Sequence, residues 1–129
     1  MLRDAPVTTV LIAKDINRAR KFYSEKLDLR LMDMPTPKDS AAFESGKGTM
    51  LYLYEREGGT RANHTAAIWL VRDIEKTVDE IQKKGVVFEQ YNRPDLKTNE
   101  DGIAESKGAK SAWFKDSEGN ILAVTEISG

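Results

Sequence analysis

The chain has 129 residues, of which 40% are hydrophobic and 32% are charged, a balance that excludes a disordered chain and a membrane-spanning protein. The net charge is −1 and basic residues alternate with acidic ones, so no basic stripe is available for nucleic acid. The absence of cysteine excludes disulfides, thiolate nucleophiles and thiolate metal sites. Residues 1–13 lack the apolar stretch and cleavage site of a signal peptide. We therefore expect a cytoplasmic protein that binds neither nucleic acid nor a membrane.

The first half of the chain is predicted to form a strand, a helix and three further strands. Residues 7–13 are apolar and β-branched, as is typical of a central strand. Asp15 is a good N-cap for a helix whose apolar positions recur at helical spacing between residues 16 and 27. Such a helix must lie on a sheet. A turn at 35–40 and a hairpin turn at 46–48 separate the remaining strands, which are expected at 29–34, 41–44 and 49–55.

The second half is predicted to repeat this pattern after a flexible link at residues 56–63, which contains Gly58-Gly59. Asp73 is a second N-cap, and Gly85 ends the second helix. A long polar stretch at 92–108 departs from the pattern and is expected to be an insertion that acts as a lid or mobile segment. The strands of this half are expected at 65–71, 86–91, 111–115 and 121–127, with a turn at 116–120.

The two halves also align residue by residue. Lys14-Asp15-Ile16 matches Arg72-Asp73-Ile74, 58 residues later, and the same offset places Tyr23 on Ile81. A repeat that occurs only twice is not a solenoid, which needs at least three units. The pattern predicts two fused βαβββ modules, 1–57 and 64–129, that complete one another, and their meeting point is the natural place for a site.

Two segments carry a family resemblance. Asp15-Ile16 through Phe22-Tyr23 and Leu27, followed by Trp113-Phe-Lys-Asp-Ser-Glu-Gly-Asn-Ile-Leu122, resembles the vicinal oxygen chelate superfamily, which includes glyoxalase I, extradiol dioxygenases and the bleomycin and fosfomycin resistance proteins. The resemblance implies an α+β fold in which residues 1–129 form a single domain. Its two tandem βαβββ modules would form a cupped mixed sheet with the helices on the outer face. Further segments are similar to a bacterial subgroup of small proteins with no established common activity: His64-Thr65, Phe88-Glu-Gln-Tyr91, Leu96-Lys-Thr98, Asp101-Gly-Ile103 and Ala112-Trp-Phe-Lys115.

The resemblance also implies where a divalent metal would be held, by side chains from the first and last strands of each module. The corresponding residues here are Thr8, Tyr52, Ala66 and Ala123. Alanine cannot coordinate a metal, threonine is a weak ligand, and one tyrosine cannot hold a metal alone. With a single histidine in the chain, only an all-oxygen site for Mg²⁺ or Ca²⁺ stays open, and the sequence shows no clustered carboxylate motif for one. We expect no metal and no cofactor.

Strand alternation predicts that the face carrying the ligands in the family is apolar and aromatic here, with a few hydroxyls and one imidazole. Such a lining suits an organic ligand held by packing. Tyr91 and Trp113 are added as candidates because a bulge would leave them either on this face or in the core. The candidate ligand-binding residues are Thr8, Tyr52, Tyr54, His64, Ala66, Tyr91, Trp113 and Ala123. The opposite face, expected to pack under the helices, has Leu11, Leu51, Leu53, Trp69, Val71, Leu122 and Val124.

Each candidate has a structural alternative. Tyr52 and Tyr54 are strand formers that would also simply fill space. A histidine at a strand entrance, such as His64, is more often a solvated loop residue, and the same holds for the polar residues of the long stretch and its exit, Lys97, Asp101 and Lys110. His64 and Asp101 would form a general base pair if the fold brought them together. No activated nucleophile is visible.

Three hypotheses follow for function. The leading one is a metal-independent small-molecule binding protein that takes an apolar or aromatic organic ligand in the sheet cup. The second is a lyase, isomerase or dioxygenase with a divalent metal at a displaced site. The third is a dimeric interaction module without a ligand. Whether a reaction is catalysed stays open, and we expect a homodimer in each case because closed two-fold pairs are the commonest oligomers.

Overall fold

The computed structural model describes residues 1–127 and divides the chain into two compact units, Met1–Arg61 and Ala62–Gly129. The division falls within the link expected at 56–63. Residues 128–129, the end of the expected second module, lie outside the described residues. Each unit is one βαβββ module, so the α+β class and the duplicated module are confirmed. No helix of the described residues is long and apolar enough to cross a membrane.

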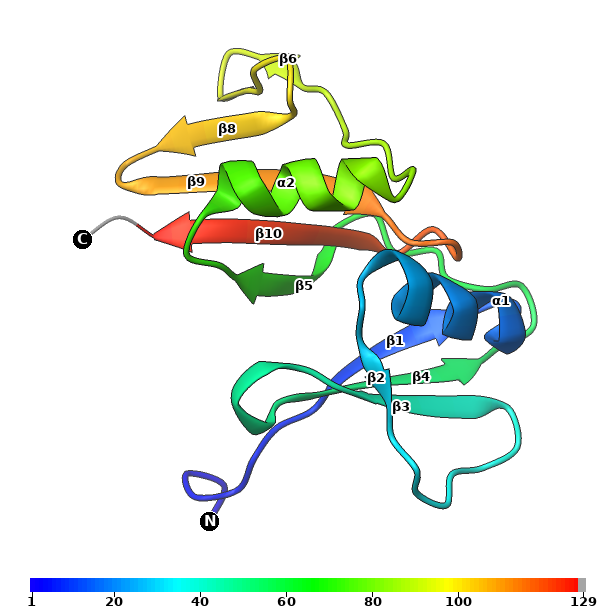
Figure 1. Cartoon of the computed structure of the whole chain (residues 1–129). Coiled ribbons are helices and arrows are strands. Elements are labelled where there is room, and N and C mark those ends of the chain that lie inside the picture. The colour runs from blue at the N-terminus through cyan, green and yellow to red at the C-terminus, as the bar shows by residue number, and fades with distance from the viewer. Residues whose placement is uncertain (128–129) are drawn as a thin grey trace. The chain divides into compact units, whose positions relative to one another are not determined.

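The first unit consists of one four-stranded sheet and one helix (Figure 1). The strand order is β1-β4-β3-β2, in which β1 and β4 run parallel and the other neighbours run antiparallel. A π-helical turn, η1, extends the α-helix. The elements are β1 (Thr9–Ala13), α1 (Ile16–Lys21), η1 (Phe22–Lys26), β2 (Arg30–Leu31), β3 (Ser40–Glu44), η2 (Gly46–Gly48) and β4 (Met50–Glu55).

The second unit has the same sheet order, β5-β10-β9-β8, again with its outer pair β5 and β10 parallel. A small hairpin, β6 and β7, is inserted between α2 and β8 and forms a separate two-stranded sheet. Figure 1 shows α2 lying over one face of the larger sheet. The elements are β5 (Thr65–Leu70), α2 (Ile74–Lys83), β6 (Asn92–Arg93), β7 (Leu96–Lys97), β8 (Ile103–Ser106), β9 (Ala109–Lys115) and β10 (Ile121–Ile127).

The second strand of the second module was predicted at residues 86–91, and this position is wrong. Residues 86–91 form no strand, and their pairing is a single isolated bridge between Phe88 and Phe114. The sheet position that β2 has in the first unit belongs to β8, which lies inside the stretch predicted to be an insertion. The true insertion is therefore shorter. Val86 and Phe88 are instead used for packing, with Phe88 buried beside Phe114 at 5.2 Å between ring centroids, whereas Val87 is exposed. In the first unit, the strand expected at 29–34 shortens to two residues, and the hairpin turn at 46–48 is a 3₁₀ turn.

The helices pack against one face of each sheet, and the residues predicted for that face lie on it. In β1 and β4, Leu11 pairs with Leu53 and both are buried. In β5 and β10, the half-buried Trp69 pairs with the buried Val124. Period-two alternation in the sequence was enough to sort these side chains, because each strand exposes its other face.

Both helices begin at the predicted aspartate. Asp15 Oδ1 accepts hydrogen bonds from the backbone N–H groups of Asn17 and Arg18, and Asp73 Oδ1 accepts one from the backbone N–H of Lys76. A glutamate near the end of each module's last strand adds a further acceptor. Glu55 Oε2 lies 3.2 Å from the backbone nitrogen of Ile16, and Glu126 Oε1 lies 2.9 Å from that of Ile74. The two-carboxylate cap is thus duplicated with the module.

Candidate functional site

The face of each sheet that its helix leaves uncovered, called here the open face, carries exposed apolar side chains. Val10 is 51% exposed on the first unit's sheet, and Ile68 and Leu70 are 58% and 73% exposed on the second. Tyr54 is also exposed, whereas Tyr52 is half-buried, and the two rings lie with their centroids 6.4 Å apart. Apolar groups gathered on one face in this way are typical of binding surfaces.

Strand register confirms that Tyr52 and Ala123 occupy equivalent places. Tyr52 pairs with Val10, and Ala123 pairs with Ile68, the residue 58 positions after Val10. One strand further in, Ala42 pairs with Tyr52 and Trp113 pairs with Ala123. The large aromatic residue and the alanine have therefore exchanged strands between the two modules. Trp113 thus lies on the open face, which resolves the alternative that the sequence left.

Thr8 and Ala66, the candidates from the first strand of each module, have no partner in the regular pairing of the described strands. Thr8 lies just before β1 and is half-buried. Ala66 lies where the register shifts, because Ile121 pairs with Thr65 and the next residue, Leu122, pairs with Ala67. This irregularity gives the neighbouring Thr65 a role that the sequence analysis missed. Trp113 Nε1 donates a hydrogen bond to Thr65 Oγ1 over 3.2 Å.

His64 and Asp101 do not form the base pair that was considered. Both are exposed, His64 before β5 and Asp101 in the turn before β8, and the described residues show no contact between them. The backbone N–H of Asp101 donates to Asn99 Oδ1, which is a turn interaction. Lys97 is likewise exposed, and Lys110 pairs with Glu75 on the helix side of the sheet. Lys110 is therefore turned away from the open face, and Lys97 belongs to the separate hairpin sheet.

Tyr91, Trp113 and Thr65 form a cluster that we call the aromatic corner. The Tyr91 and Trp113 ring centroids are 5.7 Å apart and their planes are at 82°, an edge-to-face arrangement. The inserted hairpin holds Tyr91 in place, because the Tyr91 N–H donates to Thr98 Oγ1 and the Thr98 N–H donates to the Tyr91 carbonyl, both at 2.9 Å. Both rings are half-buried. The corner is therefore a pair of aromatic rings, held by backbone hydrogen bonds of the hairpin and of β9, that stays partly exposed to solvent.

The surroundings of the aromatic corner affect its electrostatics. The guanidinium carbon of Arg93 lies 5.4 Å from the Tyr91 ring centroid, within cation–π range. The pKa of the Tyr91 phenol is raised, first by burial and then by the negative charge of Glu89, while Arg93 acts in the opposite direction. Tyr91 therefore remains a neutral phenol near pH 7.

Polar groups on the open face of the second unit are mainly hydroxyls. Ser111 Oγ and Thr125 Oγ1 lie 2.9 Å apart on paired strands, next to the Trp113 and Ala123 pair. Glu126 and Lys110 lie on the helix side, where they contact the beginning of α2. The charged groups of β9 and β10 are thus mostly turned away from the open face, with Lys115 the exception among the described residues of these strands.

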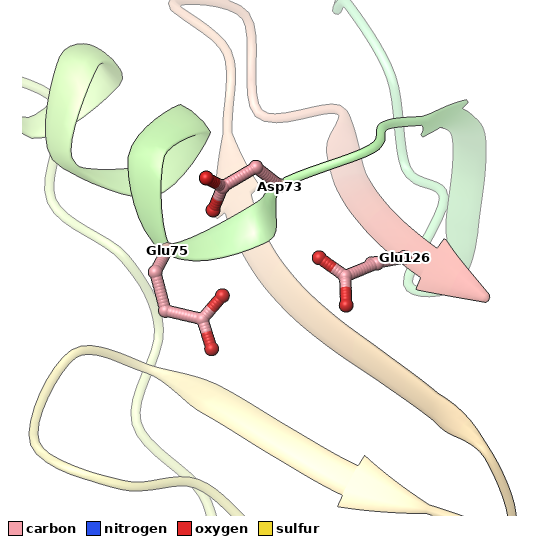
Figure 2. A group of neighbouring side chains, drawn as sticks. All are labelled: Asp73, Glu75 and Glu126. Atoms are coloured by element: carbon pink, nitrogen blue, oxygen red, sulfur yellow. The ribbon is translucent and has the colours of Figure 1, made fainter. Parts of the chain in front are cut away.

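The structure brings together three carboxylates that are not clustered in the sequence. Figure 2 shows Asp73, Glu75 and Glu126 around the beginning of α2, and each offers a ligand atom within 4.8 Å of the others. Each carboxylate already has a partner: Asp73 and Glu126 accept backbone N–H groups of α2, and Glu75 accepts from Lys110 Nζ at 3.0 Å. The duplicated cap of the first unit has Asn17 at the place of Glu75. The group is therefore a helix cap with one additional acid, and Lys110 neutralises that acid.

The residues at the family's metal positions do not fit a metal held by protein side chains. Thr8 and Tyr52 offer hydroxyl oxygens, and Ala66 and Ala123 offer no donor atom. Divalent metals in proteins are held by several carboxylate, imidazole or thiolate groups.

The fold defines a class of α+β proteins with two paired modules. In each module, one face of the sheet is covered by a helix and the other is open and apolar. The model of the Glyoxalase/Bleomycin resistance protein/Dioxygenase superfamily matches residues 6–124, and the chain belongs to this superfamily. No curated protein matched the sequence.

Solved structures with the same fold include proteins that differ in function. Lactoylglutathione lyase from Agrobacterium tumefaciens is 22% identical with a TM-score of 0.64, over 96% of this chain and 95% of that one. A glyoxalase/bleomycin resistance protein/dioxygenase from Alicyclobacillus acidocaldarius is 17% identical with a TM-score of 0.68, over 96% and 92%. The fosfomycin resistance protein FosX from Mesorhizobium loti is 13% identical with a TM-score of 0.64, over 98% and 92%. At such identities the likeness concerns the fold alone.

Proposed function

We propose that this chain is a metal-independent small-molecule binding protein that takes an apolar or aromatic organic ligand on its open sheet faces. The observation that carries the proposal is the chemistry of these faces, which combine exposed apolar residues and aromatic rings with a few hydroxyls. A lining of this kind holds an organic molecule by packing and orients it with a small number of hydrogen bonds.

Independence from a metal is supported by the donor atoms at the four family positions. Two alanines and two hydroxyl residues do not make a divalent site. The competing hypothesis is a lyase, isomerase or dioxygenase with a displaced metal, and the observation that favours it is the group of Asp73, Glu75 and Glu126. We rank it second because these carboxylates already cap α2 and pair with Lys110.

Native mass spectrometry of the purified protein, with and without chelator, tests the metal proposal. We expect the mass of the polypeptide alone, as a dimer, with no change on chelation. One metal per chain that chelator removes would overturn metal independence and direct the search toward lyase, isomerase and dioxygenase substrates.

Thermal unfolding with planar aromatic compounds, in chelator and again with added Mg²⁺ or Mn²⁺, tests the ligand. Mass action predicts that a ligand at 100 times its Kd stabilises the fold by about 2.7 kcal/mol. We expect the same rise in melting temperature with and without metal. Stabilisation that appears only with metal would contradict the proposal. An absence of stabilisation by any planar compound would instead favour the interaction-module hypothesis.

A further inference from the structure

We propose that the aromatic corner of Tyr91, Trp113 and Thr65 is the recognition subsite, and that it takes a planar aromatic ring carrying a hydrogen-bond acceptor beside the ring. This inference rests on the proposed function and deepens it, because it names one place and one chemical class of ligand. All three residues belong to the second unit.

The first step of the argument is geometric. The planes of the Tyr91 and Trp113 rings are at 82°. A flat molecule that stacks on one of these rings therefore meets the other ring at nearly a right angle, and it gains both a stacked and an edge-to-face contact. The corner is built before any ligand arrives, since Thr98 binds the backbone of Tyr91 and β9 pairs on both sides through β8 and β10. Preformed contacts cost less entropy on binding.

The second step concerns hydrogen bonding. The indole N–H of Trp113 is a donor only, and it is already used by Thr65 Oγ1. The Thr65 hydroxyl accepts that bond and keeps its own hydrogen to donate. Beside its rings the corner thus offers two hydroxyl groups, those of Thr65 and Tyr91, and each has an O–H to donate. A carbonyl oxygen, ring nitrogen or carboxylate next to an aromatic ring supplies the matching acceptor, whereas an unsubstituted hydrocarbon leaves the donor without one.

The third step is charge. Glu126 of β10 and Glu75 of α2 lie on the helix side of this sheet. Glu89, whose charge acts on Tyr91, has its Oε1 3.8 Å from Lys115 Nζ. The Arg93 guanidinium lies over the Tyr91 ring. Lys115 partly offsets the charge of Glu89, and the guanidinium of Arg93 repels a second cation at the Tyr91 ring but not an acceptor oxygen. An acceptor-bearing ligand is therefore favoured over a cationic one at this ring.

The two tryptophans make the proposal directly measurable, because each gives one indole N–H resonance in a ¹⁵N-labelled protein. Trp113 lies on the open face and Trp69 on the helix face. Two probes of similar shape, 2-acetylnaphthalene with an acceptor and 2-isopropylnaphthalene without one, are titrated while both resonances are followed. Trp69→Phe and Trp113→Phe assign the peaks.

We expect 2-acetylnaphthalene to shift the Trp113 indole peak, to leave that of Trp69 in place, and to bind about fivefold more tightly than 2-isopropylnaphthalene. Thr65→Val should reduce this preference, and Thr65→Ser, which keeps the hydroxyl, should retain it in full. Thr77→Val, which removes a hydroxyl from α2 and outside the open face, is the matched control and should leave the preference unchanged.

The outcomes separate the two proposals. Backbone shifts on the open faces with the Trp113 indole unmoved would overturn the aromatic corner and leave the proposed function standing. Equal affinity for both probes would overturn the acceptor class alone. Saturating probe that moves no resonance at all would overturn both.

Discussion

At the scale of single residues, the two tryptophans of one sheet have different roles because their side chains lie on opposite faces of that sheet. Trp69 packs toward the helix beside Val124, and Trp113 stands on the open face with its N–H bound to Thr65. The residue type alone predicts neither role. Each role follows from the side of the strand on which the side chain emerges.

Replacing Trp113 by alanine should remove most of the ligand-induced stabilisation. A buried aromatic anchor in a binding surface is typically worth about 2 kcal/mol or more, which weakens binding roughly 30-fold. Thermal shift with 2-acetylnaphthalene measures the loss. Trp69→Phe is the control and should keep the full shift relative to its own unliganded protein. A Trp113→Ala protein that is stabilised as strongly as the parent would show that the ligand contacts other residues.

The ion pair of Glu75 and Lys110 predicts a pH dependence of stability. The hydrogen bond from Lys110 lowers the pKa of Glu75, and the same bond raises the pKa of Lys110. A lowered acid pKa stabilises the fold above the unfolded value near 4.5, and this stability is lost as pH falls through the folded pKa. A raised lysine pKa stabilises below the unfolded value near 10.5, and this stability is lost as pH rises through the folded pKa.

Lys110→Met should therefore be less stable than the parent between these two values, and the difference should shrink toward zero at lower pH. Urea unfolding of both proteins at a series of pH values measures it. Because Glu75 is exposed and Lys110 is only half-buried, the difference at neutral pH should be small and should fall with added salt. A difference that is constant from neutral to strongly acidic pH would assign the effect of the substitution to lost packing of the lysine chain.

At the scale of elements, the beginning of α2 depends on an acceptor that comes from another element. Glu126 in β10 binds the first backbone N–H of the helix at 2.9 Å. The same arrangement in the first unit, Glu55 to Ile16, shows that this bond belongs to the module and not to a separate metal centre.

Glu126→Ala should destabilise the protein by about 1–2 kcal/mol, because it leaves a helix N–H without its acceptor and removes a negative charge from the positive end of the helix. Chemical denaturation measures the change. Glu80→Ala, an exposed position within the same helix, is the control and should change stability by no more than about 0.5 kcal/mol. Stabilisation of the parent by Mg²⁺ or Ca²⁺ that Glu126→Ala abolishes would contradict the assignment as a cap.

The turn into β8 is a second point where one element depends on another. Gly102 has a φ of +86°, and a Cβ placed there would lie 2.9 Å from Phe88 Cβ and 3.1 Å from the Glu89 carbonyl oxygen. Phe88 and Glu89 therefore lie next to this turn, and they also pair with β9, through the bridge of Phe88 to Phe114 and the hydrogen bond from the Glu89 N–H to the Trp113 carbonyl.

Gly102→Ala should cost about 2 kcal/mol or more, from the left-handed backbone and from the close contact with Phe88. Gly46→Ala is a matched control, because a Cβ at Gly46 meets nothing within 4 Å and its φ is not positive. We expect it to be neutral or slightly stabilising in urea unfolding. Equal stabilities of the two variants would mean that the backbone at residue 102 adapts easily.

At the scale of the whole molecule, duplication lets two copies of one scaffold diverge on their open faces while their helix faces stay alike. The caps, sheet order and buried strand positions are repeated. The open faces differ: Tyr52 stands beside Ala42 in one unit, and Ala123 beside Trp113 in the other. We propose a homodimer as the state in solution, and the native mass spectrum that tests for metal also reports it.

Local chemistry in the sequence was enough to determine the class of the fold, both helix beginnings and the sides of most strands. An aspartate cap, a helical spacing of apolar residues and a period-two alternation act over a few neighbouring residues, so they can be read without knowing what lies opposite. The equivalence of Tyr52 and Ala123 could also be predicted, since the repeat places both in the last strand of their modules.

Only the tertiary structure decided which segment completes the second sheet and which residues surround Trp113. Residues 86–91 have a stronger strand pattern than 103–106, yet the latter segment forms the strand beside β9, and residues 88–89 add only one bridge to Phe114 and one backbone hydrogen bond to Trp113. The register shift at Ala66 likewise brings Thr65 to the indole, and folding gathers Asp73, Glu75 and Glu126 around one helix end. Such pairings join residues far apart in the chain. Their energy depends on whether the distant partner fits the available space, and a pattern of neighbouring residues holds no information about that partner.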